Sequence, residues 1–150
     1  MQHTPAAKAW TDLILTLLRL NSDIVADGDR MTKDLRLSSS RWQIIAQVVH
    51  SGETLTVSQI ARNMGLQRQT VQLQVDAMAG DELLVFADNP HHRRSKLVHT
   101  TAAGRKAYRE ALRRQVGWAN RTVRGLPAKS LTQANETLKL VLERLQSNLS

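Results

Sequence analysis

The chain has 150 residues, and 41% of them are hydrophobic, which is enough for one domain with a genuine core. Its 21 basic residues outnumber the 13 acidic ones, and the resulting net charge of +8 favours a polyanionic partner over a small acidic substrate. The absence of cysteine excludes disulfides, thiolate metal sites and oxidant sensing by a thiol.

The excess of positive charge lies in the middle of the chain. Residues 61–125 contain twelve basic and five acidic side chains, whereas residues 1–60 contain six of each and residues 126–150 contain three and two. A basic helix can also be only a solvated face. No signal-peptide pattern opens the sequence, and the apolar run at residues 13–20 is too short to cross a bilayer, so we expect a cytoplasmic protein.

The first predicted element is an amphipathic helix. Apolar residues recur between Ala6 and Val25 at the spacing of one helix face, and the following sequence DGDR predicts the end of this helix. A second helix is predicted after the serines at 38–40, with a serine as its N-cap and Gly52 beyond its end. Its predicted inward-facing residues are Trp42, Ile45, Ala46 and Val49.

Two short helices are predicted next, joined by a tight turn. Thr56 and Gln59 have the capping-box spacing at the start of the first helix, and Gly65 marks its end. The second helix, within residues 68–81, turns Val71, Val75 and Met78 inward. Its outward or flanking residues are then Gln69, Thr70, Gln72, Leu73 and Asp76. This arrangement is typical of a helix-turn-helix.

A β-hairpin is predicted after the helix-turn-helix. The β-prone runs LLVFAD and SKLVHT are separated by NPHHRR, whose Asn-Pro pair marks a turn with an exposed tip. Thr101 can cap a long helix that we expect to reach Pro127, and a last helix is predicted near Ser130 to Leu149.

The two terminal helices are predicted to form a dimerisation module. Leucines of the last helix repeat at heptad intervals, and such a seam needs a partner helix. We therefore expect the two ends of the chain to pack together and against a second copy, although both helices could instead cover the chain's own core. The predicted dimerisation residues are Trp10, Leu13, Leu17, Leu138, Leu142, Leu145 and Leu149.

The predicted fold class is mainly α with a small β-hairpin wing. In a winged helix, the second helix of the motif enters the major groove, and the hairpin reaches the neighbouring backbone or minor groove. The expected domains are an N-terminal dimerisation helix and linker at 1–37, a winged helix-turn-helix DNA-binding domain at 38–100, and a long linking helix with a C-terminal dimerisation helix at 101–150.

In these motifs the sequence resembles the MarR family (multiple antibiotic resistance regulators). The resemblance rests on Trp42, LTVSQIA at 55–61, QRQTVQLQVDAM at 67–78, DNPHHRRSKLVHTT at 88–101, and Gly104. It implies a homodimeric transcriptional regulator, most often a repressor, that is released from DNA by a small molecule bound between the dimerisation helices and the DNA-binding domain. The pocket residues are unknown, and Trp42 and Trp118 are more simply read as core.

Four positions depart from the family pattern. Gln67 stands in place of the usual N-cap serine, Leu73 in place of a recognition-helix arginine, and His92 in place of a wing aspartate. Glu82 replaces a glycine, and we expect it to adopt an unfavourable backbone angle unless Gly80 shifts the end of the helix. The first three departures alter DNA-facing positions, so the operator of a relative cannot be transferred to this chain.

The predicted DNA contacts lie on the recognition helix and on the wing. Glutamine can bond an adenine edge in two places and leucine can touch a thymine methyl, so we expect an A·T-leaning site. On the wing, the resemblance implies that one arginine enters the minor groove while the other helps to hold the wing, and Ser95 and Lys96 are read as phosphate contacts. The recognition-helix residues are Gln67, Arg68, Gln69, Thr70, Gln72, Leu73 and Gln74, and the wing residues are His92, Arg93, Arg94, Ser95 and Lys96.

The adjacent histidines allow other functions. His91 and His92 could bind a metal with His99 and Asp88, but no spaced motif supplies enough ligands, so no metal or cofactor is expected. Exposed imidazoles could instead make DNA binding pH-sensitive. No catalytic arrangement is apparent, and we expect no enzyme. A metal sensor of the same fold, an architectural protein without sequence preference and a protein-interaction module remain as alternatives.

Overall fold

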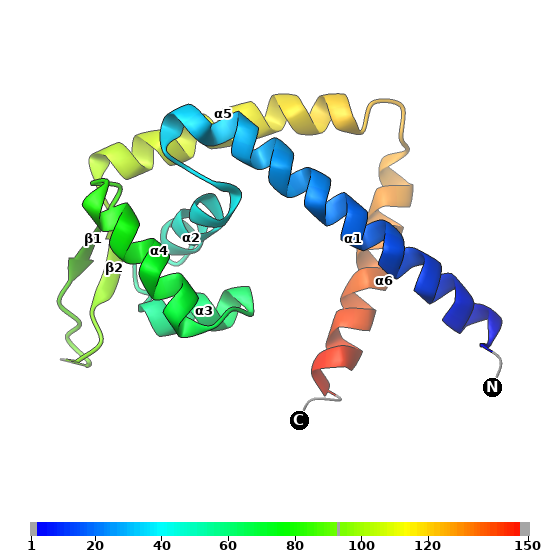
Figure 1. The fold of residues 1–150 in the computed structure, drawn as a ribbon, viewed down its shortest axis with the longest axis horizontal. Coiled ribbons are helices and arrows are strands. Elements are labelled where there is room, and N and C mark those ends of the chain that lie inside the picture. The colour runs from blue at the N-terminus through cyan, green and yellow to red at the C-terminus, as the bar shows by residue number, and fades with distance from the viewer. Residues whose placement is uncertain (1–2, 93, 148–150) are drawn as a thin grey trace. The chain divides into compact units, whose positions relative to one another are not determined.

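The computed structural model describes residues 3–92 and 94–147, and within them it confirms a mainly helical fold with one antiparallel hairpin (Figure 1). The chain divides into two compact units, residues 1–115 and 116–150. No helix in the described ranges is apolar over a length that could span a bilayer. The elements are α1 (Pro5–Thr32), the 3-10 helix η1 (Lys33–Leu35), α2 (Ser39–His50), α3 (Val57–Met64), α4 (Arg68–Gly80), β1 (Leu84–Ala87), β2 (Leu97–Thr100), α5 (Ala102–Thr122) and α6 (Ala128–Ser147).

One hydrophobic core fixes the helix-turn-helix and the hairpin against each other. The predicted inward face of α4 is confirmed, because Val71, Val75 and Met78 are buried. Each such side chain contributes roughly 1.5–3 kcal/mol by leaving water. The same core contains residues from α2, α3, both strands and the first half of α5, including Ile44, Ile45, Val48, Ile60, Leu84, Val98, Ala107, Tyr108 and Ala111.

The prediction that DGDR ends the first helix was wrong, because α1 continues to Thr32. Gly28 is buried in this turn, and a Cβ placed on it would lie 2.3 Å from Ser39 Oγ. The Ser39 hydroxyl donates to the Val25 carbonyl at 2.9 Å, and the Ser39 N–H donates to Asp29 Oδ1 at 2.6 Å. The glycine therefore permits close packing of α1 against the start of α2 and does not break the helix.

The inward face of α2 was predicted only in part. Ile45 is fully buried as expected, but Ile44 and Val48 are the other fully buried residues, while Trp42 and Val49 pack half-buried at the edge of the core. The face is broader than predicted because α2 contacts α1, α3, α4 and β2 at once.

The caps of the helix-turn-helix follow the sequence signals. The Gln59 N–H donates to Thr56 Oγ1 at 3.4 Å and the Thr56 N–H donates to Gln59 Oε1 at 2.9 Å, which confirms the capping box. Gly65 ends α3 with a φ of 64°, in the left-handed region. Gln67 occupies the N-cap position of α4 but its side chain makes no capping hydrogen bond.

The hairpin pairs Leu84 with Thr100 and Ala87 with Leu97. It is attached to the helix-turn-helix by the hydrogen bond from the Val98 N–H to the Leu55 carbonyl at 2.9 Å. The loop from Ala87 to Leu97 is thereby held beside α3 and α4, as the wing prediction requires.

The last two helices begin close to the predicted positions. The predicted cap of α5 is confirmed by the bond from the Gly104 N–H to Thr101 Oγ1 at 2.9 Å. However, α5 ends at Thr122 instead of reaching Pro127, and Gly125 takes a φ of 83° in the turn before α6.

The end of α4, the start of β1 and the start of α5 meet at four residues, which we call the Leu83 junction. These residues are Glu82, Leu83, Thr101 and Gly104. Glu82 has a φ of 59°, which confirms the expected unfavourable angle, while Gly80 stays within α4. Thr101 Oγ1 lies 2.6 Å from the Glu82 carbonyl oxygen, to which it donates. A Cβ on Gly104 would lie 2.0 Å from the Leu83 carbonyl oxygen, so only glycine allows this approach.

Replacing Glu82 by glycine is expected to stabilise the protein, because glycine adopts a positive φ without steric cost. We expect Glu82→Gly to be roughly 0.5–1 kcal/mol more stable than Glu82→Ala, which also removes the charge but keeps the strain. Urea unfolding of both variants measures the difference. A glycine variant no more stable than the alanine variant would show that the angle carries no cost.

Candidate nucleic-acid interface

The face of α4 opposite the core is polar and open to solvent. Gln67, Arg68, Gln69 and Thr70 are exposed at the start of the helix, and Leu73 is 72% exposed although it is apolar. An isolated apolar side chain on a polar helix face is suited to contact a methyl group on a partner. The structure therefore places most of the predicted recognition-helix residues on one accessible face.

The two remaining glutamines are each held by another side chain. Gln72 Nε2 donates to Asp76 Oδ1 at 2.9 Å on the exposed side of α4. Gln74 Nε2 donates to Ser40 Oγ at 2.8 Å and is half-buried against α2. Gln74 is thus turned away from the exposed face, and the structure does not bring it together with the other predicted residues.

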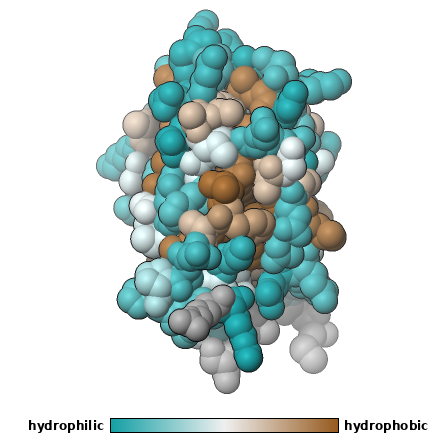
Figure 2. Space-filling view, turned by 90° about the vertical axis from the view of Figure 1, so that its left-hand side faces the viewer, coloured by the Kyte–Doolittle hydropathy of each residue, from teal (hydrophilic) through white to brown (hydrophobic). Residues whose placement is uncertain are grey.

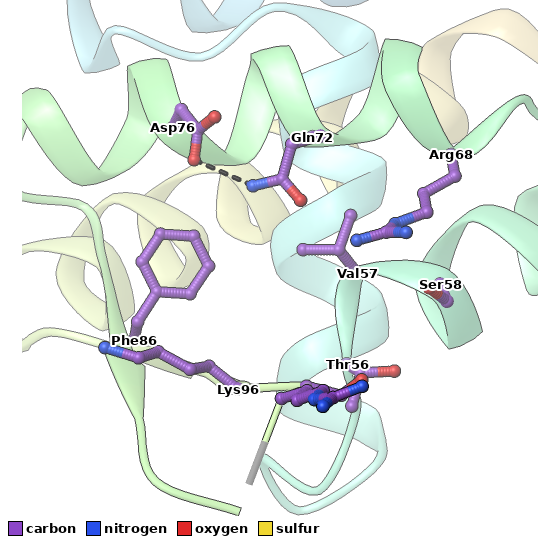
Figure 3. A pocket seen from close by; sticks show the side chains of 10 residues that line it. Thr56, Val57, Ser58, Arg68, Gln72, Asp76, Phe86 and Lys96 are labelled. Atoms are coloured by element: carbon purple, nitrogen blue, oxygen red, sulfur yellow. Dashed lines mark hydrogen bonds between the residues drawn. The ribbon is translucent and has the colours of Figure 1, made fainter. Parts of the chain in front are cut away.

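A hollow of about 290 Å³, which we call the α4–wing hollow, lies between α4, the start of α3 and the hairpin (Figure 3). Its basic residues are Arg68, Arg94 and Lys96, and its single acidic residue is Asp76. None of the three cations forms an ion pair within the described ranges. The full lining is Thr56, Val57, Ser58, Arg68, Gln72, Asp76, Phe86, Arg94, Ser95 and Lys96.

The α4–wing hollow can hold a negatively charged group. Three unpaired cations around a small concave surface produce a positive potential that is strongest where water is partly excluded. Lys96 and Arg68 reach it from opposite sides, one from the hairpin and one from α4 (Figure 3). A phosphodiester backbone, which carries closely spaced negative charges, is one kind of chain that suits such a hollow.

The predicted wing residues lie on an exposed loop. His92, Arg94, Ser95 and Lys96 are all exposed, and Arg93 lies outside the described residues. The loop is shaped locally, because the Ser95 N–H donates to the His92 carbonyl at 3.0 Å. On the side of the molecule that Figure 2 shows, hydrophilic side chains surround a narrow apolar band.

A cluster that sequence reasoning missed supports the base of the wing. In this Glu53 cluster, Glu53 Oε1 accepts from the Thr100 N–H at 3.3 Å, from the Thr100 hydroxyl and from Arg105 Nη1 at 3.2 Å. Glu53 Oε2 lies 3.5 Å from His99 Nδ1. His99 therefore faces Glu53 at the base of the wing, and the described residues show no cluster of His99 with His91 and Asp88 that could hold a metal ion.

The Glu53 carboxylate is stabilised in its charged form. Partial burial by itself raises its pKa, but the hydrogen bonds from Thr100 and the charges of His99 and Arg105 outweigh burial and lower the pKa overall. Glu53 has a φ of 64° and follows Gly52, whose φ is 67°. The sequence pair Gly-Glu indicates a turn there, but it does not reveal the partners on β2 and α5.

Other ion pairs connect α2 to the end of α4 and α5 to the 3-10 helix η1. Arg41 Nη1 lies 2.6 Å from Asp81 Oδ2 and joins α2 to the end of α4. Arg114 of α5 donates to Asp34 Oδ1 at 2.6 Å and to the Met31 carbonyl at 2.7 Å. Hydrogen bonds from Arg113 and Arg114 lower the pKa of Glu110 to about 2.

The predicted dimerisation residues lie on helices with uncovered apolar surface. On α1, Trp10 and Leu17 are half-buried and Leu13 is 36% exposed. On α6, Leu138 is half-buried and Leu142 and Leu145 are exposed. Leu149 lies outside the described residues. Further leucines are exposed on each helix, namely Leu15, Leu18 and Leu20 on α1 and Leu131 and Leu140 on α6.

Comparison with known proteins agrees with this geometry. The model of the MarR family matches residues 37–95. AbsC, a MarR family transcriptional regulator from Streptomyces coelicolor, is similar with a TM-score of 0.82 and 19% identity, over 98% of this chain and 99% of that one. CouR from Rhodococcus jostii RHA1, solved with p-coumaroyl-CoA, has a TM-score of 0.78 and 22% identity over 87% and 91%. The M. tuberculosis regulator MosR, solved with DNA, has a TM-score of 0.70 and 20% identity over 88% and 96%.

Neutralising Glu53 should weaken the attachment of the wing. Glu53→Gln removes the ion pairs to Arg105 and His99, and we expect a loss of about 1–2 kcal/mol in the free energy of unfolding near pH 7. Because the folded-state pKa of Glu53 is lowered from 4.5, its contribution is complete above that value and is lost as the pH falls through the lowered pKa.

Urea unfolding of the wild type and of Glu53→Gln, at neutral and at acidic pH, checks both statements. The difference between the two proteins should shrink at acidic pH. Glu136→Gln on α6 is the control, since Glu136 is exposed and forms no ion pair in the part of the chain that the structure describes. A constant difference across the pH range would contradict the role of the Glu53 charge.

Proposed function

We propose that the chain is a sequence-specific transcriptional regulator that binds double-stranded DNA as a homodimer, because residues 37–95 match the model of the MarR family. We further propose that it is a repressor and that a small molecule releases it. The observation that carries the proposal is the α4–wing hollow, where Arg68, Arg94 and Lys96 have no ion-pair partner among the described residues and lie beside the exposed face of α4.

The charge arrangement supports contact with the DNA backbone. Arg94, Ser95 and Lys96 on the wing and Arg68 at the start of α4 can contact phosphates on two sides of the hollow. Each phosphate that is neutralised releases a counterion, so the affinity should fall steeply with salt. With the hairpin beside α4, we assign α4 to the major groove and the wing to the adjoining minor groove.

Base reading is assigned to the exposed face of α4. Gln69, Gln72 and Leu73 can reach base edges, whereas Gln74 is engaged by Ser40 and is not assigned a base. Glutamine is matched to adenine and the leucine to a thymine methyl, so the proposal includes an A·T-leaning operator.

The homodimer is supported by the apolar surface of the terminal helices. A leucine-rich face left in water costs free energy that a second copy of the same helix can recover. Two copies related by a two-fold axis would read half-sites about 34–36 Å apart on a pseudo-palindrome.

Release by a small molecule is supported by a second cavity. This cavity of about 620 Å³ lies in the first unit between η1, the turn from α4 to β1, and α5. Its lining holds four acidic and four basic residues beside the apolar Leu35 and Leu83. Asp34, Asp81 and Glu110 are paired with arginines. Within the described ranges, Glu82 and the three cations Arg36, Lys106 and Arg109 form no ion pair. The surplus of cations over carboxylates among the residues without ion-pair partners suits an acidic compound with an apolar body, and the similar protein CouR was solved with p-coumaroyl-CoA.

A randomised-site selection with the full chain tests the proposal. The expected result is a pseudo-palindrome with half-sites about one helical turn apart, bound at physiological salt at least about a thousandfold more tightly than unrelated DNA. Equal binding to all sequences would favour an architectural protein, and no binding would favour a protein-interaction module. Selection with and without chelator distinguishes a metal sensor.

The same complex tests release. Phenolic acids and their CoA esters serve as probes, and binding to the free protein is measured by thermal shift. A probe that binds should dissociate the protein from its selected site. A probe that binds the protein and leaves the DNA complex intact would contradict the release mechanism.

A further inference from the structure

We propose that Asp76 is a positioning residue for base reading: its carboxylate fixes the orientation of the Gln72 side-chain amide, so that Gln72 presents a set acceptor and donor to an adenine. This inference rests on the proposed function, because it concerns how α4 distinguishes one DNA sequence from another. It names a specificity role for a residue that does not itself contact a base.

The relevant side chains form one row on α4. Arg68, Gln72 and Asp76 are spaced by four residues, so they lie one above another on the same helix face. All three line the α4–wing hollow. The Gln72 amide lies between the Asp76 carboxylate, to which Nε2 donates at 2.9 Å, and the side from which the Arg68 guanidinium enters the hollow (Figure 3).

The Asp76 carboxylate selects one orientation of the Gln72 amide. An ionised carboxylate can only accept hydrogen bonds, so the Gln72 group that faces Asp76 must be the NH2 group. The opposite orientation would place the Gln72 carbonyl oxygen against a carboxylate oxygen, and two acceptors repel.

This orientation leaves Gln72 prepared to recognise adenine. One of its two amide protons is used by Asp76, and the other amide proton remains available beside the carbonyl oxygen. That pair of groups matches the N7 acceptor and the N6 donor of adenine in the major groove. Because the amide is already oriented, less side-chain freedom is lost when the base is bound.

The carboxylate also has an unfavourable effect on binding. Among the described residues that line the α4–wing hollow, Asp76 is the only acidic one, and it repels any phosphate that enters. This repulsion acts on every DNA sequence, whereas the orientation of Gln72 acts at a single base pair. The two effects can therefore be separated by substitution.

The experiment uses the full chain and its selected operator. The base pair read by Gln72 is first identified as the position where Gln72→Ala loses discrimination. Dissociation constants of the wild type, Asp76→Ala and Asp76→Asn are then measured, at one salt concentration, for the operator, for the operator changed at that base pair, and for unrelated DNA.

We expect Asp76→Ala to bind unrelated DNA more tightly and to lose roughly three- to tenfold of its discrimination at that one base pair, because Gln72 is no longer oriented. Asp76→Asn keeps an oxygen that can accept from Gln72, so it should retain most of the discrimination while it also binds unrelated DNA more tightly. In the double variant with Gln72→Ala, Asp76→Ala should cause no further loss.

Three results would overturn the inference. Asp76→Ala could keep full discrimination, or Asp76→Asn could lose as much as Asp76→Ala, or Asp76→Ala could lose further discrimination in the Gln72→Ala background. The last result would indicate that Asp76 itself accepts from a base. A selection that yields no preferred site would overturn the proposed function together with this inference, whereas an unchanged discrimination at a well-defined operator would overturn this inference alone. Thermal unfolding should be unchanged, since the Asp76 side chain is exposed.

Discussion

The close approach of Gly104 to the Leu83 carbonyl oxygen is the constraint on which the rest of the interface depends. A Cβ on Gly104 would lie 2.0 Å from that oxygen, and the Thr101 hydroxyl bonds the neighbouring Glu82 carbonyl while it caps α5. The absence of a side chain at Gly104 thus allows the end of α4, the start of β1 and the start of α5 to approach one another, and the Thr101 hydroxyl bonds them together. The strained φ of Glu82 is maintained by this packing. Because the hairpin leaves the junction beside α4, the wing and the recognition helix share one hollow.

The ion pairs determine where the positive charge of the chain is left without a partner. Asp81 is neutralised by Arg41, Glu53 by Arg105, and Asp34 and Glu110 by Arg114, all in the scaffold behind the recognition face. The cations around the α4–wing hollow have no such partners within the described ranges. A net charge of +8 therefore does more than favour polyanions in general, since part of it is concentrated where a DNA backbone can be accommodated.

Local signals in the sequence were sufficient for much of the fold. The capping box of Thr56 and Gln59, the buried face of α4 and the Thr101 cap each depend on residues a few positions apart, and all are confirmed. The unfavourable angle at Glu82 is also confirmed, but its prediction came from the resemblance to a family that has glycine at this position. The continuation of α1 through Gly28 was missed because its cause is the close contact with Ser39 of the next helix. The partners of Glu53 and the half-buried position of Gln74 likewise depend on residues distant in the chain. Periodicity identified the outward face of α4 but could not indicate which polar side chains on it are bonded to each other.

Directed DNA cleavage tests most directly the claim that α4 and the wing contact different grooves of one operator. Because the chain has no cysteine, a single Leu66→Cys before α4, or a single His91→Cys on the wing loop, provides a unique attachment point for an iron chelate. The account predicts that the label beside α4 cuts within each half-site, whereas the label on the wing cuts at the flank of each half-site, one groove away. Cuts at the same positions from both labels, or cuts spread evenly along the DNA, would contradict it.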